Sequence, residues 1–483
     1  MTVSVAPPDR STGLLADLVA VLGTDGVRAG GHDLALYARD ASTIAAGDAA
    51  AVCFPTSTAE VAACVRAARR HGRPFVARGS GTGLAGGAVP QDGAVVICTT
   101  RMRTILEVDP VERVAWVQPG VLNLDLSQAV APLGLRFAPD PSSQQACSIG
   151  GNVANNAGGP HCLAEGVTAA HILALEVVLA DGEVALLGGL DPEPAGLDLR
   201  GAFVGSEGTF GIATRIACRL SPVPPEVATL LVAYDAVAPA ADTVSAVIAE
   251  GVVPAACEML TGRMIAAVEA FAHAGFPLDA EALLLVELDG LPAGVAAGVA
   301  LVERVAQAHG ARSVRVAADV VERARWWKGR KSAFGAVARI APNYYLHDTV
   351  VPRTKLASVL VEVERIAAEH DLIVCNVFHA GDGNLHPLLV FDARIPGTME
   401  RVHAAGAEIV RVSLAAGGVL SGEHGIGLEK RDFMGWLFDA VDLDAQARLR
   451  GAFDPDGVAN PHKVLPSGSR CGDLQAVPPG AWV

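Results

Sequence analysis

The sequence contains no Cys-x-x-Cys pair, although nine cysteines are scattered between Cys53 and Cys471. Iron–sulfur ligation, zinc ribbons and disulfide frameworks need cysteines at short, regular spacings, so this scatter argues against all three. The sequence also lacks any apolar run approaching the ~18 residues of a transmembrane helix. Residues 1–13 lack the basic and apolar regions of a secretory signal. We therefore expect a protein without a transmembrane segment, located in the reducing cytoplasm.

Basic residues are too few to balance the acidic ones. The chain has 37 Lys and Arg against 52 Asp and Glu, a formal net charge of −15. Nucleic acids and anionic membrane surfaces attract basic surfaces, so this balance argues against both as partners. At 483 residues the chain is longer than one hydrophobic core usually serves, and two or three domains are expected.

Glycine, by contrast, is concentrated: five glycines fall within nine residues of PFVARGSGTGLAGG, residues 74–87. Glycine permits φ > 0 and close backbone approach, so several N–H groups can converge on one anion such as a pyrophosphate. Gly81, Gly83 and Gly86 fit G-x-G-x-x-G, but a Rossmann fingerprint also needs a following helix. Within residues 88–100, Pro90 and Gly93 interrupt the chain, and the short run rich in valine and isoleucine that follows them reads as a strand instead. An ordinary glycine-rich turn is the alternative for this glycine loop taken alone.

Two further clusters of glycine and polar residues follow, at 148–162 and 204–214. One extended ligand that contacts all three clusters explains them more simply than three independent turns. Before the glycine loop, residues 50–55 read as a strand, and Ser57 with Glu60 has the spacing of a capping box. The sequence therefore predicts strand, helix, strand and then the glycine loop.

The remaining first half and the middle of the chain differ in pattern. Residues 94–137 alternate short valine-rich runs with turn signals, which predicts strands rather than helices. Pro222, Pro224 and Pro225 interrupt this pattern and predict a domain boundary. From there to about residue 375, strand-like runs alternate with alanine-rich helical stretches, which is typical of an α+β domain.

Two histidines flank a turn-like segment in NVFHAGDGNLHPLLVF, residues 376–391. If Asp382 and Gly383 are the two central residues of a tight hairpin turn, His379 and His386 face each other directly across the strands. Their Cβ atoms would then lie ~5 Å apart, close enough for both imidazoles to bind one metal ion. Two histidines packed on a sheet without a metal are the alternative.

A third candidate metal ligand is Glu423 in SGEHGIG, residues 421–427, where His424 follows it directly. Two histidines and one carboxylate leave open positions on a metal ion, as in catalytic rather than structural sites. Zinc and manganese both accept such ligands. Gly422 and Gly425 would let the backbone bend so that the adjacent side chains serve different roles. A solvent-exposed loop glutamate is the alternative.

In this order the motifs resemble those of the FAD-linked oxidases of the vanillyl-alcohol oxidase and para-cresol methylhydroxylase type. Within that type the chain is most similar to the glycolate oxidase flavoprotein subunit and to D-lactate and D-2-hydroxyglutarate dehydrogenases, from about residue 40 to 466. The resemblance implies an α+β fold with a two-part FAD-binding domain (1–222, core about 45–222), a ferredoxin-like substrate domain (223–415), a C-terminal helical segment that returns to the flavin (416–466) and a tail (467–483).

The same resemblance implies which residues contact FAD. The pyrophosphate would lie on the glycine loop, and the isoalloxazine and the rest of the cofactor on the two later clusters. Members that attach flavin covalently carry histidine at the position of Thr82, so noncovalent FAD is implied. The residues expected to bind FAD are Pro55, Arg78, Gly79, Ser80, Gly81, Thr82, Gly83, Ser148, Gly151, Asn152, Asn156, Gly158, Gly205, Glu207, Gly208, Gly211, Ile212 and Asn460.

Related dehydrogenases use the residues matching His379, His386 and Glu423 as metal ligands, and they place a base at the position of His424. A metal ion near the substrate hydroxyl lowers its pKa, and a histidine can accept the proton while a hydride leaves for the flavin. Arg330, in WWKGRKSAFGAV, would hold the substrate carboxylate with two parallel hydrogen bonds. These roles predict an oxidoreductase that acts on a 2-hydroxy acid.

Two departures from the family pattern reduce the range of substrates that we expect. Members selective for 2-hydroxyglutarate carry a lysine near the position of Leu346 and an asparagine near that of Leu388, both suited to a second carboxylate. Both positions are apolar here, which favours glycolate or D-lactate. His462 stands where the similar proteins usually carry glycine, and it receives no role.

Two other functions stay open: a noncatalytic flavoprotein subunit of an electron-transfer complex, and an oxidase of a sugar acid or aryl alcohol. A metal site beside a base would argue against the first, because electron transfer alone needs neither. The expected partners are a small 2-hydroxy acid and a separate electron acceptor, for which an iron–sulfur subunit is one candidate. A homodimer is one assembly that we consider.

Overall fold

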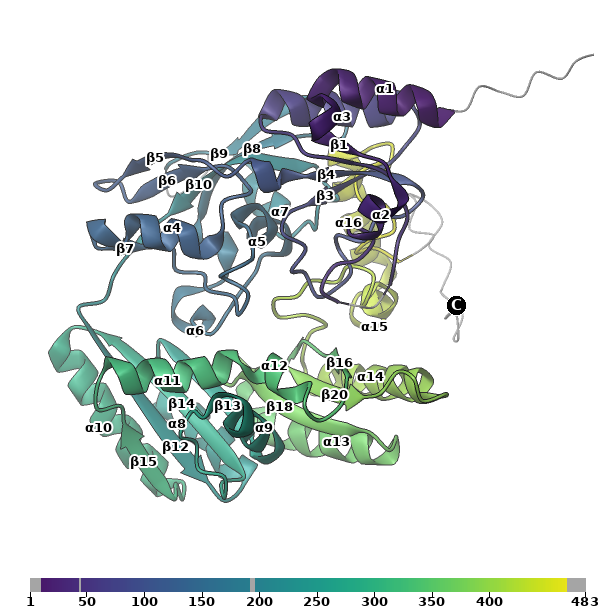
Figure 1. Ribbon diagram of the computed structural model, residues 1–483. Coiled ribbons are helices and arrows are strands. Elements are labelled where there is room, and N and C mark those ends of the chain that lie inside the picture. The colour runs from purple at the N-terminus through teal and green to yellow at the C-terminus, as the bar shows by residue number, and fades with distance from the viewer. Residues whose placement is uncertain (1–9, 43–44, 192–195, 467–483) are drawn as a thin grey trace, which may run out of the picture.

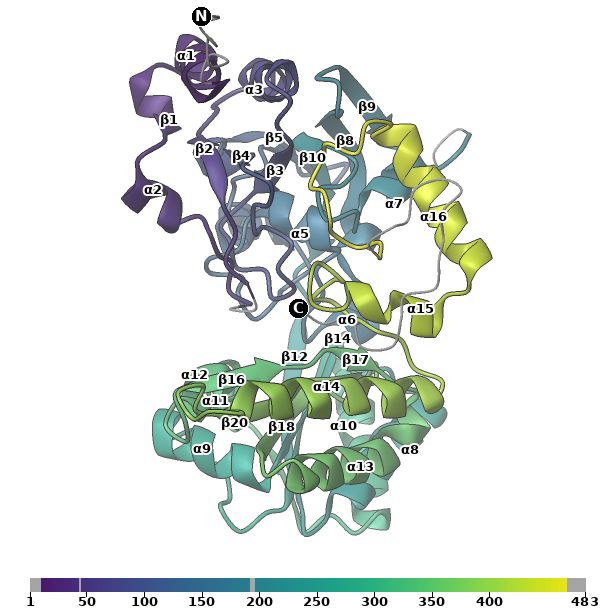
Figure 2. The same cartoon turned by 90° about the vertical axis from the view of Figure 1, so that its right-hand side faces the viewer.

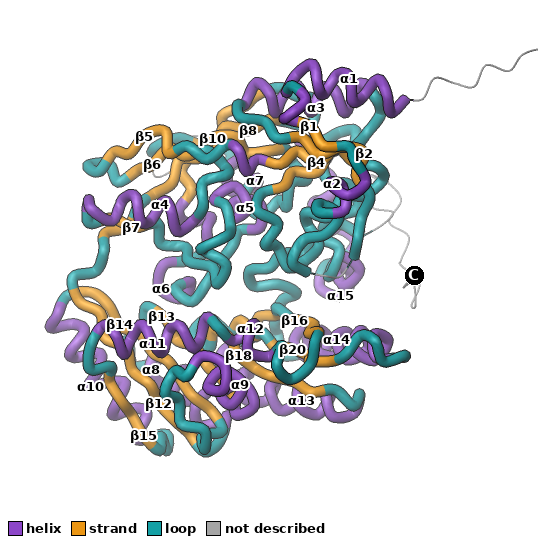
Figure 3. The backbone as a smooth tube through the Cα atoms, viewed as in Figure 1, coloured by secondary structure: helices purple, strands orange, loops and turns teal. Residues whose placement is uncertain are grey.

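The computed structural model describes residues 10–42, 45–191 and 196–466, so the expected tail at 467–483 lies outside the described residues. Within these ranges the chain forms two stacked lobes, the first purple to teal and the second green (Figure 1). Figure 2 shows that the yellow C-terminal segment runs back beside the first lobe. Helices and strands occur in both lobes (Figure 3), which confirms the α+β class. No helix within these ranges is long and apolar enough to cross a bilayer.

The first lobe begins with a four-stranded sheet of β1 (Val27–Arg28), β2 (Ala49–Cys53), β4 (Ala94–Cys98) and β3 (Phe75–Arg78), in that order. The preceding and covering helices are α1 (Arg10–Leu22), α2 (Gly31–Ala35) and α3 (Thr58–Arg70). Helix α3 begins where the sequence predicts: the Ser57 hydroxyl accepts the Glu60 N–H, and the Glu60 carboxylate accepts the Thr56 N–H. Helices α1 and α3 bury their apolar faces against this sheet.

The glycine loop leads from β3 to β4 without a helix. Residues 79–93 form only turns and bends, and β4 then lies parallel to β3. A Rossmann unit would place a helix directly after the glycines, so this connection is of a different kind, as the sequence indicates.

The second sheet of the first lobe is antiparallel and consists of β5 (Ile105–Asp109), β6 (Val114–Val117), β10 (Ile212–Arg219), β8 (Ile172–Val178) and β9 (Val184–Gly188), in that order. Near it lie the β7–β11 pair (Leu135–Arg136, Ser221–Pro222) and the helices α4 (Asn123–Val130), α5 (Ile149–Asn155), α6 (Cys162–Glu165) and α7 (Leu199–Phe203). The expectation of strands throughout 94–137 is wrong at α4. Its Leu126 and Val130 are buried at helical spacing in the core of this lobe, and that tertiary burial outweighs the local valine-rich signal.

The second lobe is an antiparallel sheet covered by helices on both faces. Its strands are, in order, β15 (Ser313–Val316), β12 (Glu226–Tyr234), β14 (Ala282–Gly290), β13 (Ala256–Thr261), β18 (Ile373–His379), β19 (Asn384–Leu385) and β17 (Thr349–Val350), and β20 (Pro387–Phe391) pairs with β18 and β16 (Asn343–Leu346). One face packs on α8 (Val237–Ala249), α10 (Pro292–Ala308), α13 (Leu356–Glu369) and α14 (Thr398–Ala415), the other on α9 (Gly262–Ala272), α11 (Val320–Lys331) and α12 (Ala333–Val337). Leu230 and Val232 point into one core and Leu231 and Ala233 into the other, which explains why β12 is continuously apolar.

The C-terminal segment, residues 416–466, connects the second lobe back to the first. Ala459 forms a bridge with the first residue of β3. The Asn460 side-chain amide donates to the carbonyl oxygens of Gly87 at 2.8 Å and Glu207 at 2.7 Å. The segment therefore fastens the glycine loop to the third glycine cluster. Its helices are α15 (Met434–Leu437) and α16 (Ala440–Phe453).

A partly buried ionic cluster around His161 joins the two lobes. Its Nδ1 lies 2.9 Å from the carboxylate of Asp140 in the first lobe, and its Nε2 lies 3.3 Å from that of Glu287 in β14. Trp327 stacks on the imidazole and donates its indole N–H to Glu287. Burial alone would lower the pKa of His161, but the two carboxylates outweigh it and raise the pKa to about 10. A charged imidazole thus bridges the lobes at neutral pH.

We expect His161→Gln to lower the free energy of unfolding by about 3 to 5 kcal/mol near neutral pH, because the buried carboxylate of Glu287 and the partly buried carboxylate of Asp140 lose their shared cation. The folded-state pKa of His161 is raised from 6.5 to about 10, so its contribution is complete below about pH 6.5 and is lost as the pH rises through about 10. Urea unfolding of both proteins across this range measures the difference. His370→Gln, which breaks a peripheral pair with Glu408, is the control. A gap that stays constant with pH would contradict the ionic bridge.

Candidate active site and metal centre

A cavity of about 420 Å³ lies where the two lobes and the C-terminal segment meet. All three glycine clusters line its first-lobe side. His386, Glu423 and His424 line the opposite side, so the cavity brings the glycine motifs and the histidine motifs together. The lining residues among those expected to bind FAD are Gly79, Ser80, Gly81, Thr82, Gly83, Ser148, Gly151, Asn152, Gly158, Glu207 and Gly208.

The backbone around this cavity suits a large anionic cofactor such as FAD. The N–H groups of residues 80–83 donate no hydrogen bond to any residue within the described ranges, so they are available to a pyrophosphate. A Cβ at Gly79 would lie 2.3 Å from the Ser148 hydroxyl oxygen, and a Cβ at Gly158 would lie 2.8 Å from the Glu423 carboxylate. Glycine is therefore required where these segments approach each other, and the residues present fit the cofactor.

Seven residues expected to bind FAD lie outside the cavity lining, and several of them shape the backbone around it. Asn156 ends α5 with φ 52°, and its side-chain oxygen accepts the Ala169 N–H at 2.8 Å. Gly211 has φ 138°, and a Cβ there would lie 2.4 Å from the carbonyl oxygen of Val178. The seven residues are Pro55, Arg78, Asn156, Gly205, Gly211, Ile212 and Asn460.

Glu207 lines the cavity, but its carboxylate is engaged with the C-terminal segment. Its two oxygens accept the N–H groups of Ile426 at 2.6 Å and Gly427 at 2.7 Å. Burial raises the pKa of Glu207 to about 7. The side chain therefore holds the third glycine cluster next to the Glu423–His424 motif.

His379 and His386 approach each other, but the direct pairing that the sequence predicts is wrong. His379 pairs with Asn384, so the turn between the strands has four residues rather than two. The Asp382 carboxylate accepts the Asn384 N–H at 3.1 Å, and Gly383 takes φ 80°, which closes the longer turn. His386 lies two residues beyond Asn384 and is thus diagonal to His379 on the same face. The imidazole rings still lie 5.0 Å apart.

Glu423 joins the two histidines in a group that could hold a metal ion. Its Oε1 lies 3.3 Å from His379 Nε2 and 3.1 Å from His386 Nε2. His379 Nδ1 lies 2.7 Å from Glu258 Oε1, and His386 Nδ1 lies 3.3 Å from the carbonyl oxygen of His347. A ring nitrogen that faces a carbonyl oxygen must donate, so His386 Nε2 carries the lone pair that a metal needs. Such hydrogen bonding behind the ligands is typical of metal-binding histidines.

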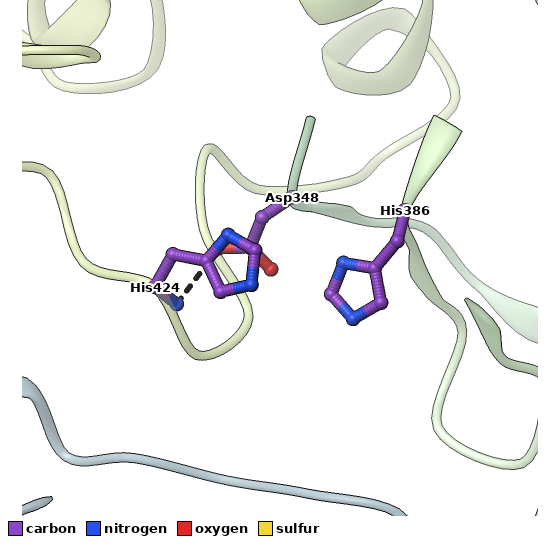
Figure 4. Close-up of side chains that lie close together, drawn as sticks. All are labelled: Asp348, His386 and His424. Atoms are coloured by element: carbon purple, nitrogen blue, oxygen red, sulfur yellow. Dashed lines mark hydrogen bonds and ion pairs between the residues drawn. The ribbon is translucent and has the colours of Figure 1, made fainter. Parts of the chain in front are cut away.

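A second group of potential ligands, Asp348, His386 and His424, shares His386 with the first (Figure 4). The carboxylate of Asp348 already accepts hydrogen bonds from residues 421–424 and from the ammonium group of Lys430. These donors occupy the lone pairs that a cation would need. The group of His379, His386 and Glu423 is therefore the better suited of the two.

The group of His379, His386 and Glu423 requires a compensating positive charge, because His379 contacts the carboxylates of both Glu258 and Glu423. Burial alone would lower the pKa of His379, but the carboxylates of Glu258 and Glu423 raise it well above its ordinary value. Burial would likewise raise the pKa of Glu423, but the two histidines hold it well below its ordinary value. Glu423 is thus ionised, and either a proton or a metal cation must offset the charge.

His424 lies in the cavity wall with its ring stacked 5.0 Å from that of His386. Burial lowers the pKa of His424 to about 4, although the carboxylate of Asp348 lies 4.0 Å away. The imidazole is therefore neutral at pH 7 and can accept a proton. Gly425 has φ 89°, which favours glycine. A Cβ at Gly422 would lie 2.3 Å from the side-chain nitrogen of Asn384. Both glycines therefore permit the tight bend beside His424.

Arg330 lies behind the cavity rather than in its wall. Its Nε donates to Glu258 at 2.6 Å, so the guanidinium contacts the carboxylate that in turn contacts His379. Its Nη1 has no hydrogen-bond partner among the residues that the structure describes. Lys331, the next residue, lines the cavity, with its Nζ 3.1 Å from the side-chain oxygen of Gln144. The cation nearest the cavity from this helix is thus Lys331.

Two protein-family models match the chain, the FAD binding domain over residues 49–188 and the C-terminal domain of FAD linked oxidases over residues 223–464. The chain belongs to the FAD-linked oxidases. This FAD-linked oxidase is 46% identical over 426 residues to glycolate oxidase subunit GlcD of Escherichia coli (strain K12), covering 88% of this chain and 85% of the relative. It is 30% identical over 452 residues to the probable mitochondrial D-lactate dehydrogenase of Danio rerio, covering 92% and 90%.

Solved structures share the fold of this FAD-linked oxidase. The structure of p-cresol methylhydroxylase with substrate bound matches with a TM-score of 0.80 at 18% identity, covering 95% of this chain and 98% of that one. The 4-ethylphenol oxidase from Gulosibacter chungangensis matches with a TM-score of 0.79 at 20% identity, covering 97% and 99%. These matches confirm the expected fold type. The family and the named relatives confirm an FAD-linked oxidoreductase that acts on CH–OH groups.

The sequence analysis missed three charged residues at the site of this FAD-linked oxidase: Glu258, Asp348 and Lys430. Each is buried. Glu258 contacts His379, Asp348 contacts the loop that carries Glu423, and Lys430 contacts Asp348. Glu258 did offer a signal, because a carboxylate inside the apolar strand ACEMLT must find a partner when it is buried. Asp348 and Lys430 lie outside any motif with recognisable spacing.

Proposed function

We propose that this FAD-linked oxidase is an FAD-dependent dehydrogenase that oxidises a small 2-hydroxy acid, D-lactate or glycolate, to the 2-oxo acid. The observation that carries the proposal is His424, neutral and stacked beside His386 in the wall of the cavity that the glycine clusters line. A proton acceptor, a group suited to a metal ion and an FAD-binding motif thus face one space. Relatives named glycolate oxidase subunit GlcD and D-lactate dehydrogenase support this substrate class.

Different residues of the chain carry out the separate steps of the proposed reaction. FAD, held without a covalent bond because Thr82 cannot replace the attaching histidine, supplies the hydride acceptor when bound. A zinc or manganese ion held by His379, His386 and Glu423 would lower the pKa of a substrate hydroxyl. The neutral imidazole of His424 accepts the hydroxyl proton, and the buried position of these side chains limits competing water.

We propose that the substrate carboxylate lies toward the end of α11. Lys331 lines the cavity there, and Arg330 lies behind it with Nη1 lacking a hydrogen-bond partner in the described part of the chain. Arginine suits a carboxylate because it can donate two parallel hydrogen bonds. Lys331 is therefore the proposed direct partner of the substrate carboxylate, and Arg330 is the proposed second cation, which supports it from behind the cavity wall.

The wall beside these cations is apolar. Phe334, Tyr344 and Leu346 line the cavity, and Leu346 pairs with the buried Leu388 across β16 and β20. Neither leucine position carries a cation, so the two leucines offer no charged partner to a second carboxylate. This supports a small monocarboxylate as the substrate.

Anaerobic bleaching of the flavin by a panel of acids and alcohols tests the proposal. We expect glycolate or D-lactate to bleach the flavin, and L-lactate, 2-hydroxyglutarate, sugar acids and aryl alcohols to bleach it far more slowly. Bleaching by a sugar acid or aryl alcohol alone would favour the oxidase alternative, and bleaching by none would favour a noncatalytic subunit. Adding dye acceptors or oxygen afterwards shows whether reoxidation needs a separate acceptor, as we propose. The relatives named as subunits support a separate partner, and the iron–sulfur subunit that the resemblance implies is one candidate for it. A cytoplasmic location and a homodimer stay predictions.

We expect Leu346→Lys to raise the rate at which 2-hydroxyglutarate reduces the flavin at low concentration by about tenfold, and to leave glycolate unimproved. An ammonium group in the apolar wall would pair with the second carboxylate, and a hydrogen bond to a charged group contributes about 1.5–3 kcal/mol, which is tenfold or more. Stopped-flow reduction with both acids measures the ratio. Leu346→Met, which keeps the wall apolar, is the matched control. An unchanged ratio would show that the substrate's far end lies elsewhere.

A further inference from the structure

The loop that carries Glu423 and His424 has no regular secondary structure. Residues 421–429 form only bends and turns, so no helix or ladder hydrogen bonds fix their backbone. The loop must nevertheless hold two side chains within a few ångströms of His386. The carboxylate of Asp348, from the connection between β16 and β17, lies fully buried against this loop (Figure 4).

Donors from consecutive residues of the loop converge on this carboxylate. They are the Ser421 hydroxyl at 2.5 Å and the N–H groups of Gly422 at 3.0 Å, Glu423 at 3.3 Å and His424 at 3.0 Å. Figure 4 marks the last of these with a dashed line. Successive N–H groups that point at one anion form a nest, whose shape is set by the position of the anion. Asp348 thus accepts the N–H groups of residues 422–424, which find no partner in secondary structure, while Glu207 accepts those of Ile426 and Gly427.

We propose that Asp348 is a positioning residue, which holds the loop so that Glu423 faces the two histidines while His424 faces the cavity. The Ser421 hydroxyl oxygen also accepts the Gly425 N–H at 2.9 Å, so the same hydrogen-bonded unit fixes the bend. The inference rests on the proposed function for the roles of Glu423 and His424. The hydrogen bonds themselves do not depend on which substrate is oxidised.

Lys430 provides the competing explanation. Its buried ammonium group lies 3.1 Å from Asp348 Oδ2 and needs a counter-charge whatever the loop does. Asp348→Asn alone would leave that ammonium unpaired, so a loss of function could reflect the unpaired charge. The double variant Asp348→Ala with Lys430→Met removes both charges together and leaves no side-chain oxygen at position 348 to accept the loop N–H groups.

The experiment compares the double variant with wild type and with Asp439→Asn. Asp439 caps α16 by accepting two N–H groups at an exposed position of the same C-terminal segment, and asparagine caps equally well. Each protein is stripped of metal, titrated with Mn²⁺ or Zn²⁺, and then reduced anaerobically in a stopped-flow instrument. For the double variant we expect metal affinity and the limiting rate of flavin reduction each to fall about 10- to 100-fold, the usual effect of losing a group that orients ligands. Wild-type values in the double variant would overturn the proposal.

Amide hydrogen exchange provides a measurement that does not depend on the variant's folding. In the metal-free wild type we expect the N–H groups of residues 422–424 to exchange slowly, although they belong to a loop, because Asp348 rather than the metal holds them. Exchange at the unprotected rate in metal-free protein would overturn the proposal, also where the double variant fails to fold. If no 2-hydroxy acid reduces the wild type, the proposed function fails, while exchange and metal affinity still decide the role of Asp348.

Discussion

His424→Ala is expected to slow reduction of the flavin by the 2-hydroxy acid about 10²- to 10⁴-fold, which is the usual contribution of a positioned base. FAD and metal contents should stay at the wild-type level, because the ring of His424 is not in the group formed by His379, His386 and Glu423. Anaerobic stopped-flow measurement of the limiting rate, together with elemental analysis and the flavin spectrum, tests both parts of the expectation.

The pH dependence gives this prediction a second test. Burial lowers the pKa of His424 to about 4, so the neutral form that accepts protons is present above that pH and is lost as the pH falls through about 4. The wild-type rate of flavin reduction should therefore stay level as the pH falls from about 8 to about 5. Added imidazole should restore part of the activity of His424→Ala by filling the vacated space. A wild-type rate in the variant, or no rescue together with loss of FAD, would contradict the assignment of the base.

His386→Ala is expected to remove the metal ion and the activity together. His386 contributes to a buried group in which Glu423 Oε1 lies 3.1 Å from its Nε2, and alanine supplies no donor atom in its place. A metal ion that acts on a substrate oxygen contributes several kcal/mol, so flavin reduction should slow by about 10³-fold or more. Elemental analysis and stopped-flow reduction of the same preparation measure the two losses.

Chelation of the wild type serves as the parallel experiment, since it removes the ion without changing a side chain. Activity should fall with the metal content and return when Zn²⁺ or Mn²⁺ is added back, and the ion that restores it identifies the metal. His370→Ala is the control for replacing a histidine of the second lobe, because His370 pairs with Glu408 away from the cavity. A purified wild type that holds no metal and still reduces its flavin with substrate would refute the metal site.

Much of the fold could be predicted from the sequence because its signals are local. The capping pair of Ser57 and Glu60 marked the start of α3, and the valine-rich strand after the glycine loop excluded a Rossmann helix. At α4 local signals were insufficient. The burial of Leu126 and Val130 depends on a core built from distant strands, which a window of a few residues does not contain.

For the site, the sequence by itself determined which chemical groups are present and in which order the motifs follow: the glycine loop, the histidine pair and the Glu423–His424 motif. Only the tertiary structure decided how these groups meet. The four-residue turn places His379 opposite Asn384. The guanidinium of Arg330 pairs with Glu258 and therefore lies behind the cavity. The reason is physical: buried charges and backbone N–H groups must be paired. Their partners come from residues far away in the sequence, and the local spacing of a motif therefore does not predict which residues pair.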